Sequence, residues 1–254
     1  STSNRDHFYI VDAKTLYYEN SAVVGANLSG LTILNEQYGL VTGDGIRRID
    51  LKSLNNVRIK NERLLCFYNS IIYNGKVLSN DTYKDESKVK YYDVNELIAA
   101  KEGEAPAVTE LDIIQKQKIN FVLAKDGNVY TLESADNGCN IVKIKNDFTL
   151  EKVFANFQPA KGPYHSSPTI GMVASETENI IYLVSTDGAI YKYILGDSDS
   201  LKAPFIAAES GVSITAPLQL NQQSGELYVT YTEERKDESK IVVYSKDGKV
   251  LHTV

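Results

Sequence analysis

One strand-and-turn pattern recurs along the chain and constrains its fold more than any other feature. Each copy is a stretch of alternating apolar and polar residues, followed by a polar turn and a second, shorter apolar stretch. An early copy begins at Phe8. The later copies begin at Ile46, Val89, Ile141, Ile190 and Ile241. These five starts are separated by 43, 52, 49 and 51 residues, a near-constant period that predicts a repeat architecture.

Each repeat is predicted to contain four strands. A second strand precedes each hairpin, and Asp44-Gly45 and Asp187-Gly188 form turns that join the two, because both residue types accept positive φ. Asp126-Gly127 is another such turn, one strand earlier in its repeat. A further strand opens the later units, where Pro168 and Pro217 lie 49 residues apart. Proline suits the first residues of a strand because it has no backbone N–H to donate to the neighbouring strand.

Four-stranded units of about 50 residues are typical of β-propeller blades, which stack because a single blade cannot cover both of its apolar faces. The 17 Tyr and the many Val, Ile and Thr between turn residues also predict an all-β fold. We expect a single propeller domain over residues 1–254, with six blades favoured, the first one partial, and five blades as the alternative. The expected N-terminal half-blade is 8–20, and the full blades are roughly 21–60, 61–110, 111–158, 159–206 and 207–254.

One segment alone predicts a helix, "DVNELIAAKEGE" from Asp93 to Glu104. Leu97 and Ile98 favour a helix there, Asn95 is the candidate N-cap and Gly103 the candidate end. We therefore expect a short helical turn within a loop.

Charge and hydropathy argue against a nucleic acid partner and against a transmembrane helix. The net charge is −6, and the only Lys/Arg cluster is Arg47-Arg48, whereas a phosphate-backbone binder needs a concentrated basic surface. We therefore expect no nucleic acid partner. No apolar run reaches the roughly 18 residues of a transmembrane helix. The start "STSNRD" is interpreted as the trimmed end of a longer precursor, which favours an exported protein (periplasmic, cell-surface or secreted) over a cytoplasmic one.

Two quoted stretches resemble the repeats of quinoprotein-like and YVTN-type β-propellers. They are "SSPTIG…NIIYLVSTDGAIYKYI" and "TAPLQL…GELYVTYT…SKIVVYSKDGKVL". The shared pattern is a Ser/Ala-Pro start, an apolar strand that ends near Asp-Gly, and then a strand and a turn. The resemblance is one of fold, and folds of this kind carry unrelated functions.

The resemblance implies that the loops before the first strand and between the second and third strands share one face, where propellers commonly bind ligands. The loop "AKGPYHSSP" (160–168) and the two copies of "KDESK" (84–88 and 236–240) are expected there. The candidate binding residues are Tyr164, His165, Ser166, Asp85, Glu86, Asp237 and Glu238. Calcium is not expected at KDESK, because each copy has Lys on both sides and lacks the spacing of a DxDxDG loop.

No residue set identifies a reaction. Quinone enzymes of the resembling family stack their cofactor on Trp against a disulfide between neighbouring cysteines, but this chain has no Trp, and Cys66 and Cys139 are far apart. Whether these two cysteines are bonded stays open. No CxxC motif, no paired His spacing and no GxSxG elbow occurs, so no catalytic residue, metal ligand or cofactor is assigned. The prediction is a non-enzymatic scaffold for a protein, peptide or glycan ligand. A lactonase- or glycosidase-like hydrolase with its site at the central channel is the alternative.

Overall fold

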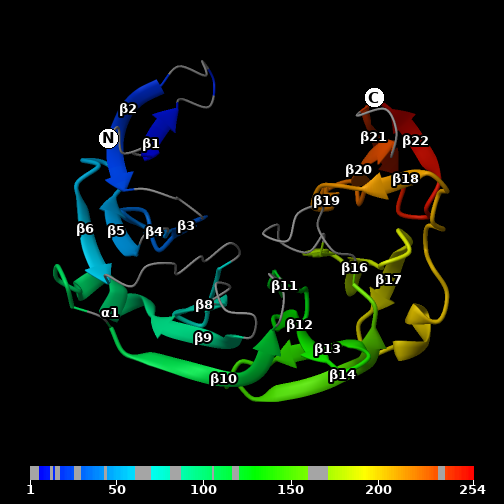
Figure 1. The fold of residues 1–254 in the computed structure, drawn as a ribbon, viewed down its shortest axis with the longest axis horizontal. Helices are drawn as coiled ribbons and strands as arrows, with labels where there is room; N and C mark the ends of the chain where they lie inside the picture. Colours follow the sequence, from blue (N-terminus) through cyan, green and yellow to red (C-terminus); the bar gives the residue numbers. More distant parts are fainter. Residues whose placement is uncertain are drawn as a thin grey trace. The chain divides into compact units, whose positions relative to one another are not determined.

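The computed structural model describes residues 6–11, 14, 18–25, 30–42, 45–60, 70–80, 87–104, 106–115, 120–159, 171–233 and 238–254. The chain divides into two compact units, unit 1 from Ser1 to Lys116 and unit 2 from Gln117 to Val254. In the described ranges the secondary structure is β apart from one short α-helix and one 3-10 helix (Figure 1).

Unit 1 holds three antiparallel sheets. A two-stranded sheet pairs β1 (Asp6–Val11) with β2 (Tyr18–Gly25). The next sheet has the order β3 (Gly30–Ile33), β4 (Tyr38–Thr42), β5 (Ile46–Asp50) and β6 (Asn56–Lys60). The third has the order β7 (Ile71–Tyr73), β8 (Lys76–Asn80), β9 (Ser87–Asp93) and β10 (Val108–Gln115).

Unit 2 also holds three antiparallel sheets. The first has the order β11 (Val122–Leu123), β12 (Val129–Ala135), β13 (Gly138–Ile144) and β14 (Leu150–Phe157). The second contains β15 (Met172–Ala174), β16 (Ile180–Val184) and β17 (Ile190–Ile194). In the last, β18 (Val212–Ile214) and β19 (Gln219–Leu220) both pair with β20 (Leu227–Glu233), which is followed by β21 (Ser239–Tyr244) and β22 (Val250–Thr253).

The spacing predicted from the sequence falls on equivalent strands in the five later copies. Ile46 begins β5 and Ile190 begins β17, while β9, β13 and β21 contain Val89, Ile141 and Ile241, and each of these is the third strand of its sheet. The early start at Phe8 lies in β1 of the two-stranded sheet. The Asp126-Gly127 turn joins β11 to β12, the first and second strands, which is the earlier position expected for it. The period therefore reports equivalent strands in successive sheets.

Two strands differ from the prediction for a local reason. After β17 the chain forms a turn and the 3-10 helix η1 (Ser198–Leu201) instead of a fourth strand, because the Asp197 side chain accepts a hydrogen bond from Asp199 N and caps η1. The strand expected around Pro217 is split into β18 and β19. Pro217 lies between these two strands and has no N–H group to donate to β20.

The helix is shorter than predicted and has a different cap. Helix α1 spans Val94–Ala99, and the Asp93 carboxylate accepts hydrogen bonds from Asn95 N and Glu96 N, so Asp93 and not Asn95 is the N-cap. The helix ends at Ala100 and not at Gly103. Arg48 on β5 donates to the carbonyl oxygens of Ile98 and Ala100, which satisfies backbone acceptors at the helix end.

The cores lie between neighbouring sheets of one unit. In unit 1, Leu40, Ile46 and Val77 pack with Tyr92 and Leu97 between the β3–β6 and β7–β10 sheets. In unit 2, the β15–β17 sheet is covered on both faces. One core joins it to β11–β14 through residues such as Tyr130, Ile181 and Tyr193, and another joins it to the last sheet through residues such as Tyr182 and Val229. This packing is the stacking that the repeat requires.

Candidate functional site

The candidate site lies along one edge of the sheets of unit 2, which we call the loop edge. It carries the connections between second and third strands and the segments that lead from one sheet to the next. The two KDESK copies end in equivalent strands, because Ser87 and Lys88 belong to β9 in unit 1 and Ser239 and Lys240 to β21 in unit 2. Residues 84–86 and 236–237 lie outside the described residues, so the shared loop position stays a prediction for them.

The segment 160–170 has both of its ends fixed beside β16. On one side, Pro159 forms an antiparallel bridge with Ser185, and Thr186 N donates to Gln158 O at 2.8 Å. On the other side, Val184 N donates to Gly171 O at 3.3 Å. The two ends thus lie next to consecutive residues of one strand end.

We call the contacts that hold Pro159 and Gly171 beside β16 the frame. A second contact joins this frame to the β12–β13 turn. The Gln158 side chain donates to Asn137 O at 2.6 Å and lies over Gly138, whose φ is +121°. A Cβ at position 138 would collide with Gln158 Nε2 and with the Phe157 carbonyl oxygen. Only glycine at position 138 therefore allows the Gln158 side chain to reach the β12–β13 turn.

The β16–β17 turn completes the frame through Asp187. Its carboxylate accepts hydrogen bonds from the Ser185 hydroxyl and, at 3.0 Å, from Ala189 N. The bond from Ser185 has the larger effect and the bond from Ala189 the smaller, and together they hold the pKa of Asp187 below its usual value. Asp187 is thus a charged turn residue whose bonding capacity is used within the turn.

Most of the predicted binding residues lie outside the described residues: Tyr164, His165, Ser166, Asp85, Glu86 and Asp237. Glu238 is described and exposed, and its backbone carbonyl accepts a hydrogen bond from Glu233 N at 3.1 Å. The frame residues Gln158 and Gly138 were missed by the sequence reasoning. The Asn-Gly pair in "ADNGCN" is the one signal that could have marked that turn.

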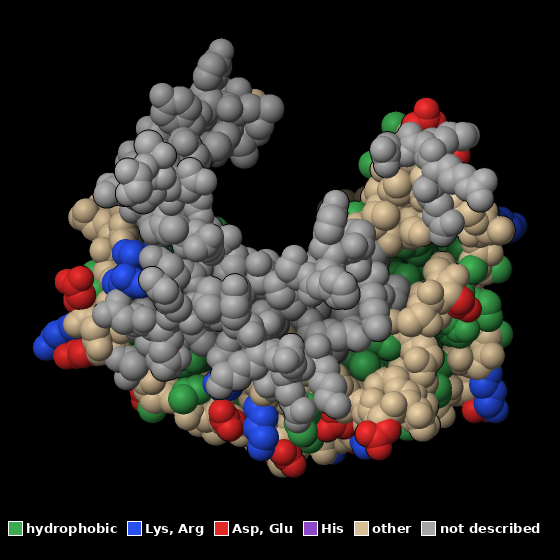
Figure 2. Space-filling model, in the orientation of Figure 1, with side chains coloured by type: hydrophobic (Ala, Val, Ile, Leu, Met, Phe, Trp, Pro, Cys, Tyr) green, Lys and Arg blue, Asp and Glu red, His purple; other side chains and the backbone are tan. Residues whose placement is uncertain are grey.

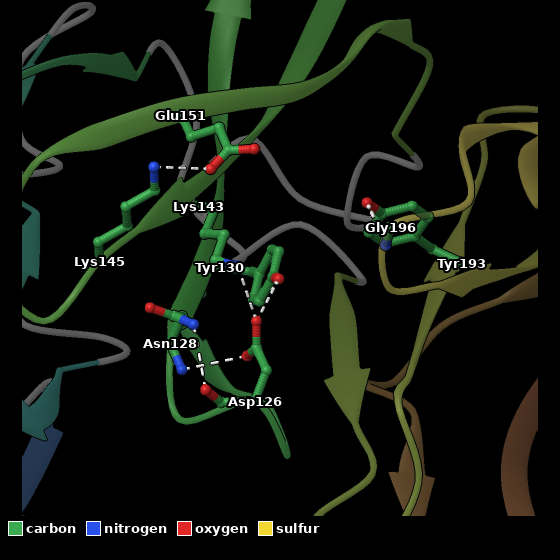
Figure 3. A network of polar contacts seen from close by, with 8 residues as sticks. All are labelled: Asp126, Asn128, Tyr130, Lys143, Lys145, Glu151, Tyr193 and Gly196. Atoms are coloured by element: carbon green, nitrogen blue, oxygen red, sulfur yellow. Dashed lines mark hydrogen bonds and ion pairs between the residues drawn. The ribbon is translucent and has the colours of Figure 1, made fainter.

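A polar network lies at the opposite edge of the β11–β14 sheet (Figure 3). The Asp126 carboxylate accepts a hydrogen bond from Tyr130 Oη at 2.9 Å and lies 2.9 Å from Lys143 Nζ. Burial acts to raise the pKa of Asp126, but bonds from Lys143, Asn128 and Tyr130 outweigh it, so the pKa is lowered. Burial and the Asp126 carboxylate raise the pKa of Tyr130. Both pKa values are therefore shifted away from neutral pH, which suits a structural network and not acid–base catalysis.

The remaining buried reactive groups also have structural surroundings. Tyr231 and Tyr244 share a hydrogen bond of 3.0 Å between their hydroxyl oxygens. Cys139 carries a free thiol that is 4% exposed, and burial, with a smaller effect of Glu133, raises its pKa to about 11. A thiol with a raised pKa is a poor nucleophile. Cys66 lies outside the described residues.

Two kinds of feature are absent from the described part of the chain. There, no group of three or more His, Cys, Asp and Glu side chains is arranged to hold a metal ion. No helix in that part combines the length and the apolar character that a membrane span needs.

Solved structures with the same fold are β-propellers, and they establish the fold of this chain. A functionally unknown protein from Desulfotomaculum acetoxidans DSM 771 matches with a TM-score of 0.63 and 12% identity, over 97% of this chain and 76% of that one. The Cps50 (Swd1) β-propeller domain of Myceliophteria thermophila matches with a TM-score of 0.59 and 11% identity, over 98% and 80%. Virginiamycin B lyase from Staphylococcus aureus matches with a TM-score of 0.53 and 13% identity, over 100% and 82%.

These identities show the fold alone, and the neighbours include a lyase beside proteins whose names state no reaction. A comparison with curated proteins found no match. A family model, by contrast, matches residues 2–253, nearly the whole chain. The chain is a β-propeller that belongs to the family described as Domain of unknown function (DUF5074).

Proposed function

We propose that this protein is a non-enzymatic binding module whose ligand contacts the segment 160–170 on the loop edge of unit 2. The observation that carries the proposal is the pair of anchors at Pro159 and Gly171, which hold the ends of this segment beside β16. Binding residues are commonly carried on segments that a rigid scaffold positions at both ends. Tyr164, His165 and Ser166 are the proposed contact residues.

The second-to-third connection of unit 2, with Asp237 and Glu238 of one KDESK copy, extends this proposed surface. In unit 1, taken by itself, Asp85 and Glu86 of the other copy are proposed as contact residues. Each copy carries two acids and two lysines, so it offers hydrogen-bond donors and acceptors with little net charge. We therefore propose a polar ligand, either a protein or peptide segment or a glycan.

Four described residues with shifted pKa values have structural roles. A catalytic acid or base needs a pKa near the working pH. Asp126 and Asp187 instead have lowered pKa values, and Tyr130 and Tyr231 raised ones, in each case with a bonding partner inside the fold. These groups therefore stabilise the fold and are poorly suited to proton transfer.

The test uses immobilised arrays of random peptides and of glycans, probed with the purified protein. Ligands that bind are then measured against the variant Tyr164→Ala/His165→Ala/Ser166→Ala. We expect at least a tenfold loss of affinity for this variant. The matched control is Lys246→Ala, an exposed residue in the β21–β22 turn at the opposite edge, which should change the affinity less than twofold. Equal binding by the triple variant and the wild type would refute the proposed surface.

A parallel assay addresses the hydrolase alternative. Chromogenic lactones, esters and glycosides are incubated with the wild type and with His165→Ala. The binding-module proposal expects no turnover above the buffer rate. Turnover that His165→Ala abolishes would replace the proposal with a hydrolase whose site includes the same segment.

A further inference from the structure

Two Asn-Gly pairs lie at hairpin turns, Asn74-Gly75 between β7 and β8 and Asn137-Gly138 between β12 and β13. Such a pair is chemically reactive, because the glycine nitrogen can attack the asparagine side-chain amide and glycine has no Cβ to hinder that attack. Both asparagines are exposed. Sequence and exposure therefore predict equal reactivity, and a difference must come from how each turn is held.

The first pair occupies the two central positions of its turn. Tyr73 pairs with Lys76, and the φ values of Asn74 and Gly75, +47° and +71°, are of the kind that Asn-Gly adopts in two-residue hairpins. In such a turn the N–H of Lys76 donates to the Tyr73 carbonyl, so the N–H of Gly75 has no part in the turn bond. Nothing lies within 4 Å of the place that a Cβ on Gly75 would take. The turn therefore leaves the attacking nitrogen open.

The second pair lies one position later in its turn. Ala135 pairs with Gly138, so the N–H of Gly138 is the donor that closes the turn. The Asn137 carbonyl belongs to the same peptide group and accepts a hydrogen bond from Gln158 Nε2 at 2.6 Å. Attack on the Asn137 side chain requires this peptide group to rotate, but hydrogen bonds hold both of its polar atoms.

We propose that Asn74 is a deamidation site of the folded protein and that Asn137 is protected. The Gly75 nitrogen loses its proton and attacks Cγ of Asn74. The C–N bond of the side-chain amide then breaks, and its NH2 group takes up a proton and leaves as ammonia. The resulting succinimide adds one water molecule from the solvent, which opens the ring to aspartate or isoaspartate. The site lies in unit 1 and does not rest on the proposed function.

The modification acts on the start of helix α1. The Gly75 carbonyl accepts a hydrogen bond from Val94 N at 2.9 Å, and Lys76 Nζ lies 2.7 Å from the carboxylate of Asp93, the N-cap of α1. Figure 2 shows acidic and basic side chains interspersed around α1, as expected for a solvated surface. Isoaspartate lengthens the backbone of the turn by one methylene, so the carbonyl that holds Val94 must move.

Peptide mapping by mass spectrometry measures both sites in one sample. The folded protein is incubated at mildly alkaline pH, and the deamidated fractions at Asn74 and Asn137 are followed over time. Asn74 should deamidate at least tenfold faster than Asn137. In the chain unfolded by guanidinium chloride, where neither turn exists, the two rates should agree within threefold. Equal rates in the folded protein, or no reaction at Asn74 while the unfolded chain reacts, would overturn the proposal.

Two variants test the causes separately. Gln158→Ala removes the bond to the Asn137 carbonyl and should speed deamidation at Asn137 at least threefold, with the rate at Asn74 unchanged. Gly75→Ala adds a Cβ beside the attacking nitrogen and should slow deamidation at Asn74 at least tenfold, with the rate at Asn137 unchanged. A wild-type rate at Asn137 in Gln158→Ala, or at Asn74 in Gly75→Ala, would contradict the corresponding step.

Hydrogen exchange tests the effect on α1. In protein that carries isoaspartate at position 74, the Val94 amide should exchange at least fivefold faster than in fresh protein. Asn74→Asp is the matched control, because it carries the new carboxylate without the extra methylene, and its Val94 amide should exchange at the wild-type rate. Equal exchange in the aged and the fresh protein would refute the link between the turn and the helix.

Discussion

Among the described glycines, Gly138 is the one whose surroundings most severely restrict a substitution. Its φ is +121°, and the Gln158 side chain and the Phe157 carbonyl occupy the space that a Cβ would need. Gly211 has a comparable φ of +80° but open space around the position of a Cβ. A comparison of the two positions therefore separates the cost of a positive φ from the cost of a steric collision.

Alanine substitutions at these glycines should have unequal effects. Gly211→Ala is expected to lower the free energy of unfolding by about 1 kcal/mol, the cost of a left-handed alanine. Gly138→Ala should lower it by more than about 2 kcal/mol, because Gln158 and the strand end must also move. Urea denaturation of both variants measures the difference. Equal losses would show that the contact between Gln158 and the turn contributes nothing.

Strand β15 is joined to both neighbouring sheets by side-chain amides. Asn120 donates to Met172 O at 2.6 Å and accepts from Met172 N at 3.2 Å. Gln222 donates to Ala174 O at 3.0 Å and accepts from Glu176 N at 2.8 Å. Each amide thus satisfies one donor and one acceptor of a neighbouring backbone, as a strand residue would.

Removing one of these joints should loosen β15 at one end. Asn120→Ala is expected to lower the free energy of unfolding by about 2 kcal/mol, since it removes two hydrogen bonds and leaves a backbone pair unsatisfied. Hydrogen exchange of the Met172 amide should become at least tenfold faster. Gln223→Ala, at an exposed neighbour of Gln222, is the control and should change neither quantity. Unchanged exchange at Met172 in Asn120→Ala would contradict the role of the joint.

The strands that the sequence predicted well are those with a strong alternating pattern. Ile190 and Ile241 could be placed because apolar alternation and a repeated spacing agree. The elements that differ depend on single side chains: Asp197 forms a cap where a fourth strand was expected, and Asp93 takes the capping position assigned to Asn95. The bond from Gln158 to Asn137 joins residues that are 21 positions apart, and no local pattern encodes it.

Tyrosine burial makes the whole molecule sensitive to alkali. Burial, followed by the nearby carboxylates of Glu178 and Asp247, raises the pKa of Tyr182 to about 12, and the pKa values of Tyr130 and Tyr231 are raised as well. A raised pKa means that the unfolded chain releases its proton first, so stability is full below about pH 10 and falls as pH rises toward the folded value. Below that range these three tyrosines contribute no pH dependence to the free energy of unfolding.

The free energy of unfolding should therefore fall steeply between about pH 10 and pH 12, by up to about 1.4 kcal/mol per pH unit for each such tyrosine. Tyr182→Phe should reduce this slope by one group's share. Urea melts at several pH values, followed by tyrosinate absorbance, measure the slope. A slope that is the same in Tyr182→Phe would contradict the burial effect.

The adjacent anchors of Pro159 and Gly171 also make the segment between them suitable for engineering. Because both ends are held beside β16, the anchors themselves do not depend on the length of the chain between them. Doubling the length of a flexible loop costs only about 0.6 kcal/mol. A foreign peptide inserted there would be carried as a tethered loop on a preformed propeller, which makes this position a natural place for peptide display.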